Sequence, residues 1–562
     1  MLPTSAVFAF ASMLAFAAPA SALHQGVDGS PSAAPAPPRL IAFIVVDQMI
    51  PEQLERLRPH LTGGLGRFVS QGTWYRDAWI DYAITVTAPG HATLSTGVFP
   101  CRHGVVANEK PKRDESGLQA TVAEPGALRV PGLVDWVRLR APGSRSFSAS
   151  VKDRAAILLA GQAPEVAVCW DISAGGFEPA LPGVKDLPKW IADWNAGWIE
   201  RATPGGKPWV WEPALPADPD ALGCQPDNQP GESPGLLGGI EFPHAGPSAP
   251  AAGERARKLA AFVVATPLGD SFCIDLARRA VEQLDLGADA VPDVLCVSLS
   301  GCDTVGHALG PYSREVTDLL LRTDRELARL FDDLDARVGK DGWIAALSSD
   351  HGVPDLVERR LANGQEARRI PNATLSDARR AVEVALVEHG LGDALLAFDG
   401  HALFLKPSRL RDPKTDPVEL RRHLRKLLVE RLPCARAYTR EDLAGACAFG
   451  HAHAAGAAES NDAAPDPWFA LAARSYDAER SPDVAIQYPP GHLVLRPNGT
   501  THGSTYDYDR RVPLVFLGPG FGAREDWRRV RTVDALPTLL AAAALPVPDG
   551  LDGRALLGAD ER

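Results

Sequence analysis

The sequence predicts an α/β fold with a mainly parallel central sheet and helices on both faces. Continuous runs of apolar and β-branched residues, typical of strands buried on both faces, occupy residues 40–46, 294–299, 343–347 and 512–517. Segments with helical periodicity alternate with them, at residues 51–69, 275–284, 313–338 and 378–389. Such alternation is typical of parallel sheets, whose crossover helices cover both faces.

Three of the four strand-like runs end just before an acidic residue. These residues are Asp47, Asp303 and Asp350, and the fourth run ends in a Gly-Pro-Gly turn at residues 518–520. Ligands of open α/β sheets bind beyond the carboxyl ends of the strands. We therefore expect three carboxylates to gather where a ligand would bind.

Length and composition favour one large catalytic domain over residues 39–562. The chain has 562 residues, 45% of them hydrophobic and 23% charged, which is an ordinary globular composition. The fragments that carry chemistry run from Asp47 to His502, so separate successive domains fit poorly. Two regions break the alternation and are predicted to be inserted caps, at about 170–260 and 396–490. The second contains a candidate strand at 402–405 and a candidate helix at 416–431.

The first residues predict export, to the periplasm or the medium. Residues 1–22 combine an apolar stretch with the small residues Ala20-Ser21-Ala22, as in a signal peptide, although no Lys or Arg precedes the stretch. An uncleaved anchor is the alternative. Residues 23–38, rich in Ala, Pro and Ser, are expected to be a disordered tether. No other segment has the roughly 18 apolar residues that a transmembrane helix requires.

Charge and cysteine content restrict the partners. The net charge of −12 argues against a nucleic-acid surface, which needs a basic patch. Any affinity for phosphate must therefore come from a local site. The eight cysteines permit disulfides in an exported chain, and Cys434 and Cys447 could close a short loop. The pairing and the oligomeric state do not follow from the sequence.

Five separated fragments offer ligands for two zinc ions. Together they contain three carboxylates, three imidazoles and one hydroxyl, on Asp47, Thr87, Asp303, His307, Asp350, His351 and His502. Zinc accepts imidazole nitrogen and carboxylate oxygen, and a catalytic site keeps one position open. Asp303 and His307 are four residues apart, so one helical turn places both on the same face. Two such ions can hold the attacking and leaving oxygens of a phosphoryl transfer.

These fragments resemble the alkaline phosphatase superfamily, and within it the phosphate-irrepressible alkaline phosphatases with a Thr nucleophile. The resemblance runs from about residue 40 to the C-terminus, where residues 533–553 are similar to a tail shared within the superfamily. It implies that Thr87, the second Thr of Thr85-Val86-Thr87-Ala88-Pro89-Gly90-His91, attacks phosphorus, with Thr85 as the next candidate. It also implies that one zinc is held by Asp303, His307 and His502. The other is then held by Asp47, Thr87, Asp350 and His351.

The resemblance adds three substrate-binding residues. Asn108 lies 21 residues after Thr87, a spacing at which the family places an Asn that donates to a phosphoryl oxygen. Lys152 and Arg154 match a Lys–Arg pair that the Thr-nucleophile phosphatases direct at the phosphoryl group. By itself, the charged run at 152–154 would be expected on the solvated surface. Lys152 is expected to replace the magnesium ion of the three-metal phosphatases, which leaves two metals.

The predicted function is zinc-dependent hydrolysis of small-molecule phosphate monoesters through a phosphothreonine intermediate. A monoester dianion carries more charge than a diester, and Lys152 with Arg154 suits that charge. A phosphodiesterase or nucleotide pyrophosphatase with the same zinc site is the first alternative, and a non-catalytic phosphate-binding protein is the second. Sulfatase chemistry is disfavoured because Thr87 replaces the Cys or Ser of the sulfatases, and His91 their Arg. No motif identifies the physiological substrate.

Overall fold

The computed structural model describes residues 36–124, 126–215, 218–248, 254–444, 466–494 and 496–557. The pattern of contacts between residues divides the chain into two units after Ala36. The fold described below is that of the second unit, Pro37–Arg562. The predicted signal peptide at 1–22 and nearly all of the predicted tether at 23–38 lie outside the described residues.

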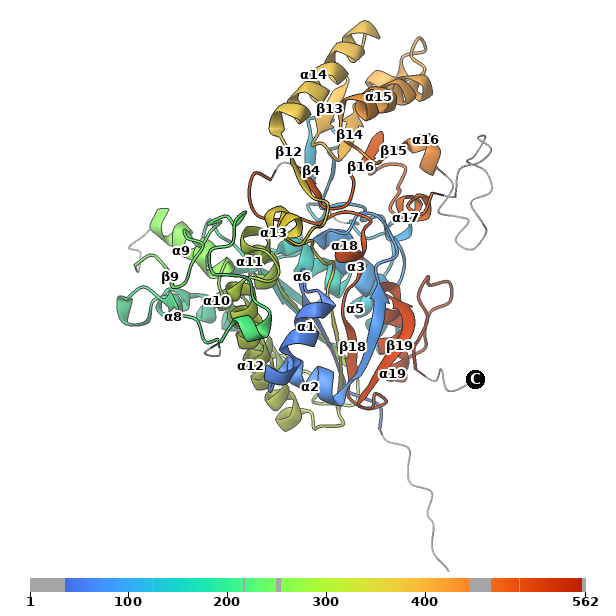
Figure 1. Ribbon diagram of the computed structural model, residues 1–562. Helices are drawn as coiled ribbons and strands as arrows, with labels where there is room; N and C mark the ends of the chain where they lie inside the picture. The colour runs from blue at the N-terminus through green and yellow to red at the C-terminus, as the bar shows by residue number, and fades with distance from the viewer. Residues whose placement is uncertain are drawn as a thin grey trace, which may run out of the picture. The chain divides into compact units, whose positions relative to one another are not determined.

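A nine-stranded sheet forms the centre of this unit (Figure 1). In spatial order its strands are β19 (Arg524–Arg531), β2 (Thr73–Trp79), β18 (Leu514–Leu517), β11 (Trp343–Ser348), β1 (Leu40–Val46), β10 (Asp293–Leu299), β5 (Ser146–Ser150), β6 (Val166–Trp170) and β7 (Phe177–Pro179). Strand β1 pairs in parallel with both β10 and β11. Among these nine strands only β18 and β7 run against the others. The predicted mainly parallel α/β fold is confirmed.

Alternate residues of β1 enter two different cores. Leu40, Ala42, Ile44 and Val46 pack against α1 (Pro51–Leu57), α2 (Gly64–Gln71), α10 (Pro267–Gln283) and α12 (Arg314–Arg337). Ile41, Phe43 and Val45 pack against α3 (Thr87–Thr96), α5 (Leu133–Arg140), α6 (Asp153–Ala160) and α19 (Ala535–Ala542). Figure 1 shows α10 and α12 on one side of the sheet and α19 on the other. Burial on both faces explains why the strand has no polar residue.

The helix predicted at 51–69 is broken in the structure. It consists of α1, a 3-10 turn at Arg58–His60, and α2. Pro59 occupies the turn, and the Asp324 carboxylate of α12 accepts the backbone N–H groups of Thr62, Gly63 and Gly66. These bonds satisfy the amides that the break exposes. The other predicted helices overlap α10, α12 and α14 (Asn372–Glu388) and end within one residue of them.

The direction of strand β18 differs from the prediction. The run at 512–517 was predicted to be another parallel strand, but β18 is antiparallel to β11 and to β2. The preceding segment places His502 at the carboxyl edge of the sheet, beside the carboxylate of Asp303. A strand that starts from this edge must run back across the sheet, which explains its direction.

Two groups of elements lie outside the large sheet, in the parts of the chain where insertions were predicted, although β7 of the large sheet also falls in the first of these stretches. The first contains α7 (Lys189–Asn195), α8 (Trp198–Ala202), β8 (Val210–Trp211), β9 (His244–Ala245) and α9 (Glu254–Val264). The second contains an antiparallel sheet in the order β13 (Leu395–Phe398), β14 (Ala402–Leu405), β16 (Val484–Gln487) and β15 (Arg436–Thr439). This sheet shares a core with α14 and α15 (Pro417–Arg431). We retain as a proposal the insertion boundaries of about 170–260 and 396–490.

The structure contradicts the suggested disulfide between Cys434 and Cys447. Cys434 has a free thiol, half-buried beside the core of the small sheet, so a Cys434–Cys447 bond is not formed. Cys101 is disulfide-bonded, and Cys447 lies outside the described residues.

In the described part of the chain, no single helix is long and apolar enough to cross a membrane. The helical segments Ala256–Val264 and Pro267–Gln283 together have the length and composition of a membrane span, but they are bent by 83° at the break between them.

Gly90 allows α3 to touch the end of β11. A Cβ at this position would lie 2.3 Å from the backbone oxygen of Asp350. Gly90→Ala should therefore lower the free energy of unfolding by about 1–3 kcal/mol, because neither backbone can yield easily. Chemical denaturation would measure this loss. Gly522→Ala is the matched control, since a Cβ there meets nothing within 4 Å; equal effects of the two changes would contradict this account of the contact.

Candidate metal centre and active site

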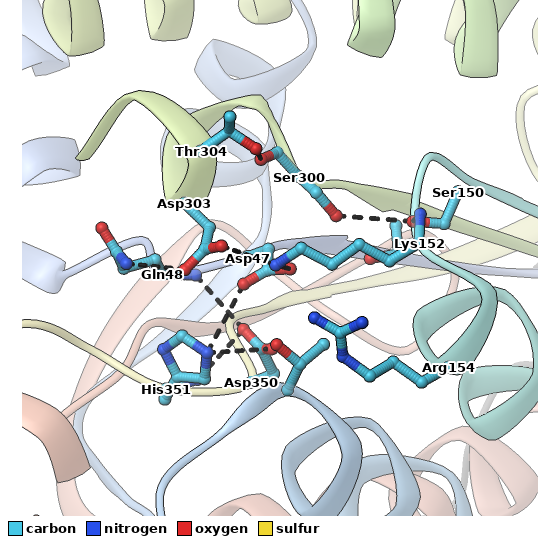
Figure 2. A network of polar contacts seen from close by, with 12 residues as sticks. Asp47, Gln48, Ser150, Lys152, Arg154, Ser300, Asp303, Thr304, Asp350 and His351 are labelled. Atoms are coloured by element: carbon cyan, nitrogen blue, oxygen red, sulfur yellow. Dashed lines mark hydrogen bonds and ion pairs between the residues drawn. The ribbon is translucent and has the colours of Figure 1, made fainter. Parts of the chain in front are cut away.

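Three neighbouring parallel strands bring the predicted carboxylates together. Asp47 follows β1, Asp350 follows β11, and Asp303 lies in α11 (Gly301–Leu309), the helix after β10. The carboxyl ends of adjacent parallel strands meet at one edge of a sheet, so the three side chains converge (Figure 2). Their exposed fractions are 0%, 0% and 5% respectively.

The three histidines complete two groups of ligand atoms. In each group the atoms lie within 4.8 Å of one another: Asp47, Asp350 and His351 form one group, and Asp303, His351 and His502 form the other. The rings of His351 and His502 stack with centroids 3.5 Å apart. His307 joins the second group, because its Nε2 is 3.2 Å from Asp303 Oδ1. All six predicted protein ligands other than Thr87 are thus close together.

Each of these imidazoles is held by a backbone carbonyl. Nδ1 of His307 donates to the oxygen of Thr500 at 2.9 Å, and Nδ1 of His502 donates to the oxygen of Thr85 at 2.8 Å. Nδ1 of His351 donates to its neighbour Gly352 at 3.1 Å. A carbonyl only accepts, so Nδ1 carries the proton and Nε2 keeps its lone pair. This tautomer, with Nε2 turned to the carboxylates, is the one that binds a metal.

Buried atoms without partners mark one ligand group. Among the described residues, no hydrogen bond reaches Asp47 Oδ1, Asp350 Oδ2 or His351 Nε2. The nearest nitrogen to Asp350 Oδ2 is Nδ1 of His91 at 3.2 Å, and that nitrogen is hydrogen-bonded to the carbonyl of Thr87. The other oxygen of Asp350 accepts the backbone N–H groups of Gln48 and His351, at 3.2 and 3.1 Å. Buried polar atoms are rarely left unpaired, and a cation would satisfy these three. The residues therefore fit a divalent metal ion, and their nitrogen and oxygen donors suit zinc.

The three carboxyl groups titrate differently. Burial and the nearby Asp350 charge raise the pKa of Asp47 above its ordinary value. Burial also opposes the charge of Asp303, but His307 and Lys152 hold the pKa of Asp303 well below its usual range. Burial opposes the charge of Asp350 as well, but His91 and Lys152 together lower the pKa of Asp350 below its ordinary value. Burial lowers the pKa of His351 well below its ordinary value, so this ligand is neutral.

Thr87 lies at the N-terminus of α3 and is 2% exposed. The N-cap of this helix is Val86, which has no polar side-chain atom. Thr87 is therefore not the cap. The Asn108 Oδ1 atom accepts the N–H of Ala88 at 2.9 Å, which leaves the NH₂ end of Asn108 to donate to a ligand. The Thr85 hydroxyl, in contrast, donates to the Ser504 carbonyl at 2.9 Å.

Lys152 links the two ligand groups. Its Nζ donates to Asp47 Oδ2 and to Asp303 Oδ2, at 2.6 Å each. Burial alone would lower the pKa of Lys152, but Asp303 and Asp47 raise it above its ordinary value. The side chain is 14% exposed, so it is not part of a solvated cluster. Lys152 Nζ therefore lies between carboxylates of the two groups, and its contact with a phosphoryl group stays a prediction.

Arg154 extends toward the same carboxylates (Figure 2). Its Nε atom is buried, and no acceptor in the described residues reaches it. Its ion pair with the adjacent Asp153 is long, at 3.8 Å. Arg154 therefore retains donors for an anion.

Two further residues contact the predicted ligands, and sequence reasoning missed one of them, Gln48. His91 has Nδ1 3.2 Å from Asp350 Oδ2 and 2.9 Å from the Thr87 carbonyl, so it connects α3 to a predicted ligand. Gln48 donates from Nε2 to Asp303 Oδ1 at 2.6 Å. The signal for Gln48 was the glycine in Asp303-Thr304-Val305-Gly306-His307, since glycine allows a close approach.

Comparisons with known proteins identify the family. The family model of type I phosphodiesterases and nucleotide pyrophosphatases matches residues 41–144 and 243–509. Alkaline phosphatase PafA of Elizabethkingia meningoseptica is 27% identical over 539 residues, covering 92% of this chain and 93% of that protein. Alkaline phosphatase PhoK of a Sphingomonas species is 30% identical over 558 residues, covering 93% and 92%.

A solved structure extends the likeness to the fold. The crystal structure of wild-type PafA superposes with a TM-score of 0.79 at 26% identity, covering 93% of this chain and 99% of that one. The protein is therefore a member of the type I phosphodiesterase and nucleotide pyrophosphatase family in the alkaline phosphatase superfamily, and within it an enzyme of the Thr-nucleophile alkaline phosphatase group.

Proposed function

We propose that this chain is a two-zinc phosphomonoesterase that works through a covalent phosphothreonine at Thr87. The observation that carries the proposal is the convergence of the ligands, with buried and unpartnered atoms on Asp47, Asp350 and His351. Asp303, His307 and His502 would hold one zinc ion. Asp47, Thr87, Asp350 and His351 would hold the other.

The bound zinc ions would stabilise the negative charge that develops on the attacking and leaving oxygens. Thr87 supplies the nucleophile at the N-terminus of α3, where the helix dipole favours the alkoxide. Its Oγ1 forms a bond to phosphorus, the bond from phosphorus to the ester oxygen breaks, and the alcohol leaves with a proton. Water then attacks the phosphothreonine, which releases inorganic phosphate and restores the Thr87 hydroxyl. Thr85 is less suited, because its hydroxyl is bonded to Ser504.

Lys152 and Arg154 support a monoester substrate. Both stand at the start of α6, which packs against α3, the helix that begins with Thr87. One solved PafA structure carries substitutions of a Thr, of an Asn 21 residues later, and of a Lys and an Arg two residues apart. The same residue types recur here at the same spacings, in Thr87 and Asn108 and in Lys152 and Arg154. Two cations at the start of the helix that packs against α3 suit a dianion better than a monoanionic diester.

The rival function is a phosphodiesterase or nucleotide pyrophosphatase, the activity that describes the matching family model. A non-catalytic phosphate-binding protein is disfavoured, because the complete ligand set and Thr87 are present. Export of the enzyme, based on residues 1–22, is part of the proposal. The substrates would be small phosphate monoesters.

Removal of the metal should abolish activity. The ligands come from fragments that meet only in the folded chain, and the zinc they hold would stabilise the transition state. Dialysis against a chelator should therefore stop release of p-nitrophenol from p-nitrophenyl phosphate, and added zinc should restore it. Full activity after metal analysis has confirmed removal would refute the zinc site.

Thr87→Ala should eliminate the phosphoenzyme, whereas Thr87→Ser should keep measurable turnover. Acid quenching with labelled substrate would measure the covalent intermediate, and zinc analysis would check that the site still binds metal. Thr85→Val is the control, and it should still accumulate phosphoenzyme. If Thr87→Ala accumulates the intermediate and Thr85→Val does not, Thr85 is the nucleophile.

Lys152→Ala and Arg154→Ala should narrow the preference for monoesters over diesters. A charge-assisted hydrogen bond contributes roughly 1.5–3 kcal/mol, so each change should lower monoester kcat/KM by about 10- to 100-fold. Diester hydrolysis should fall less, because a diester leaves fewer bare oxygens. Rates on p-nitrophenyl and bis-p-nitrophenyl phosphate give the ratio, with exposed Lys185→Ala as control. A proportional loss on both substrates would mean that the pair only supports the fold, and a wild-type preference for diesters would favour the rival function.

A further inference from the structure

Gln48 contacts both ligand groups at once (Figure 2). Its side-chain Nε2 donates to Asp303 Oδ1 at 2.6 Å, and its backbone N–H donates to Asp350 Oδ1 at 3.2 Å. It also follows Asp47 directly in the chain. Gln48 thus connects Asp350, of one ligand group, to Asp303, of the other.

The backbone at Gln48 is in the left-handed region, with φ of 70°. Residues other than glycine adopt this conformation at a cost, and such positions gather at functional sites. The structure describes four non-glycine residues with positive φ, and of these only Gln48 is buried, with 1% exposed. A glycine would adopt this backbone conformation without strain. The Gln48 side chain must therefore contribute enough stabilisation to offset the free-energy cost of its positive φ.

The facing helix leaves room for the amide. Gly306 lies between Asp303 and His307 on α11, and a Cβ on Gly306 would lie 2.2 Å from Gln48 Oε1. Within the described residues no donor reaches that Oε1 atom, although it is buried. A carboxylate only accepts hydrogen bonds, so the NH₂ end of Gln48 must face Asp303. The side chain is therefore held by this bond alone.

We propose that Gln48 is a positioning residue that sets the orientation of Asp303 and couples the two metal positions. Asp303 Oδ1, which accepts the amide, also faces His307 Nε2 at 3.2 Å and His502 Nε2 at 3.5 Å. The hydrogen bond from the Gln48 side-chain amide therefore orients Asp303 Oδ1 toward the two imidazoles. The inference rests on the proposed two-zinc function. Loss of a residue that orients a metal ligand typically weakens metal affinity by 10- to 100-fold.

Zinc affinity of the full chain, measured by competition with a chromophoric chelator, tests the role of Gln48. Gln48→Gly removes the amide and relieves the backbone, so the metal-free variant should unfold at no lower temperature than the metal-free wild type. It should nevertheless bind one of its two zinc ions about 10- to 100-fold more weakly. Gln48→Asn, which also tolerates the left-handed region but is shorter, should lose similar affinity. Gln48→Glu, which sets a carboxylate against Asp303, should lose more.

Three outcomes would overturn the inference, and they are distinguishable. Wild-type affinity for both zinc ions in Gln48→Gly and Gln48→Asn would show that the amide does not orient Asp303. A loss of stability in metal-free Gln48→Gly that accompanies the weaker binding would show a purely structural role. A wild-type chain that holds fewer than two zinc ions would overturn the two-zinc proposal itself, and this inference with it.

Discussion

The burial of three carboxylates at one edge of the sheet is the constraint on which the rest of the structure depends. Asp47, Asp303 and Asp350 are almost fully enclosed, and like charges brought together out of water repel each other strongly. Lys152 offsets part of this repulsion through its two contacts of 2.6 Å. Unpartnered atoms nevertheless remain on two of the carboxylates. The arrangement is complete only with further positive charge, which two zinc ions would supply.

The chain holds its ligands rigidly through the backbone. The imidazoles of His307, His351 and His502 each donate to a main-chain carbonyl, so their Nε2 atoms have a defined direction before any ion binds. The loop with His502 is attached to Thr85, two residues before the proposed nucleophile. The proposed metal ligands and the proposed nucleophile are therefore parts of one hydrogen-bonded unit, and such preorganisation is what catalysis by fixed charges requires.

Sequence patterns predicted what depends on local order. The run at 40–46 coincides with β1, and the strand-end carboxylates converge because adjacent parallel strands share an edge. The six carboxylate and histidine residues that the motifs selected lie close together in the structure, and their role as ligands stays a prediction. What depends on distant contacts was not predictable: the direction of β18 follows from the position of His502, and the break before α2 follows from Asp324. Gln48 was missed because its left-handed backbone and its bond to Asp303 exist only in the folded chain.

Anomalous diffraction from zinc-loaded crystals, collected at the zinc absorption edge, tests the central claim most directly. The account predicts two peaks. One should lie within bonding distance of Asp303, His307 and His502, and the other within bonding distance of Asp47, Thr87, Asp350 and His351. A single peak, or peaks bound by other residues, would contradict it.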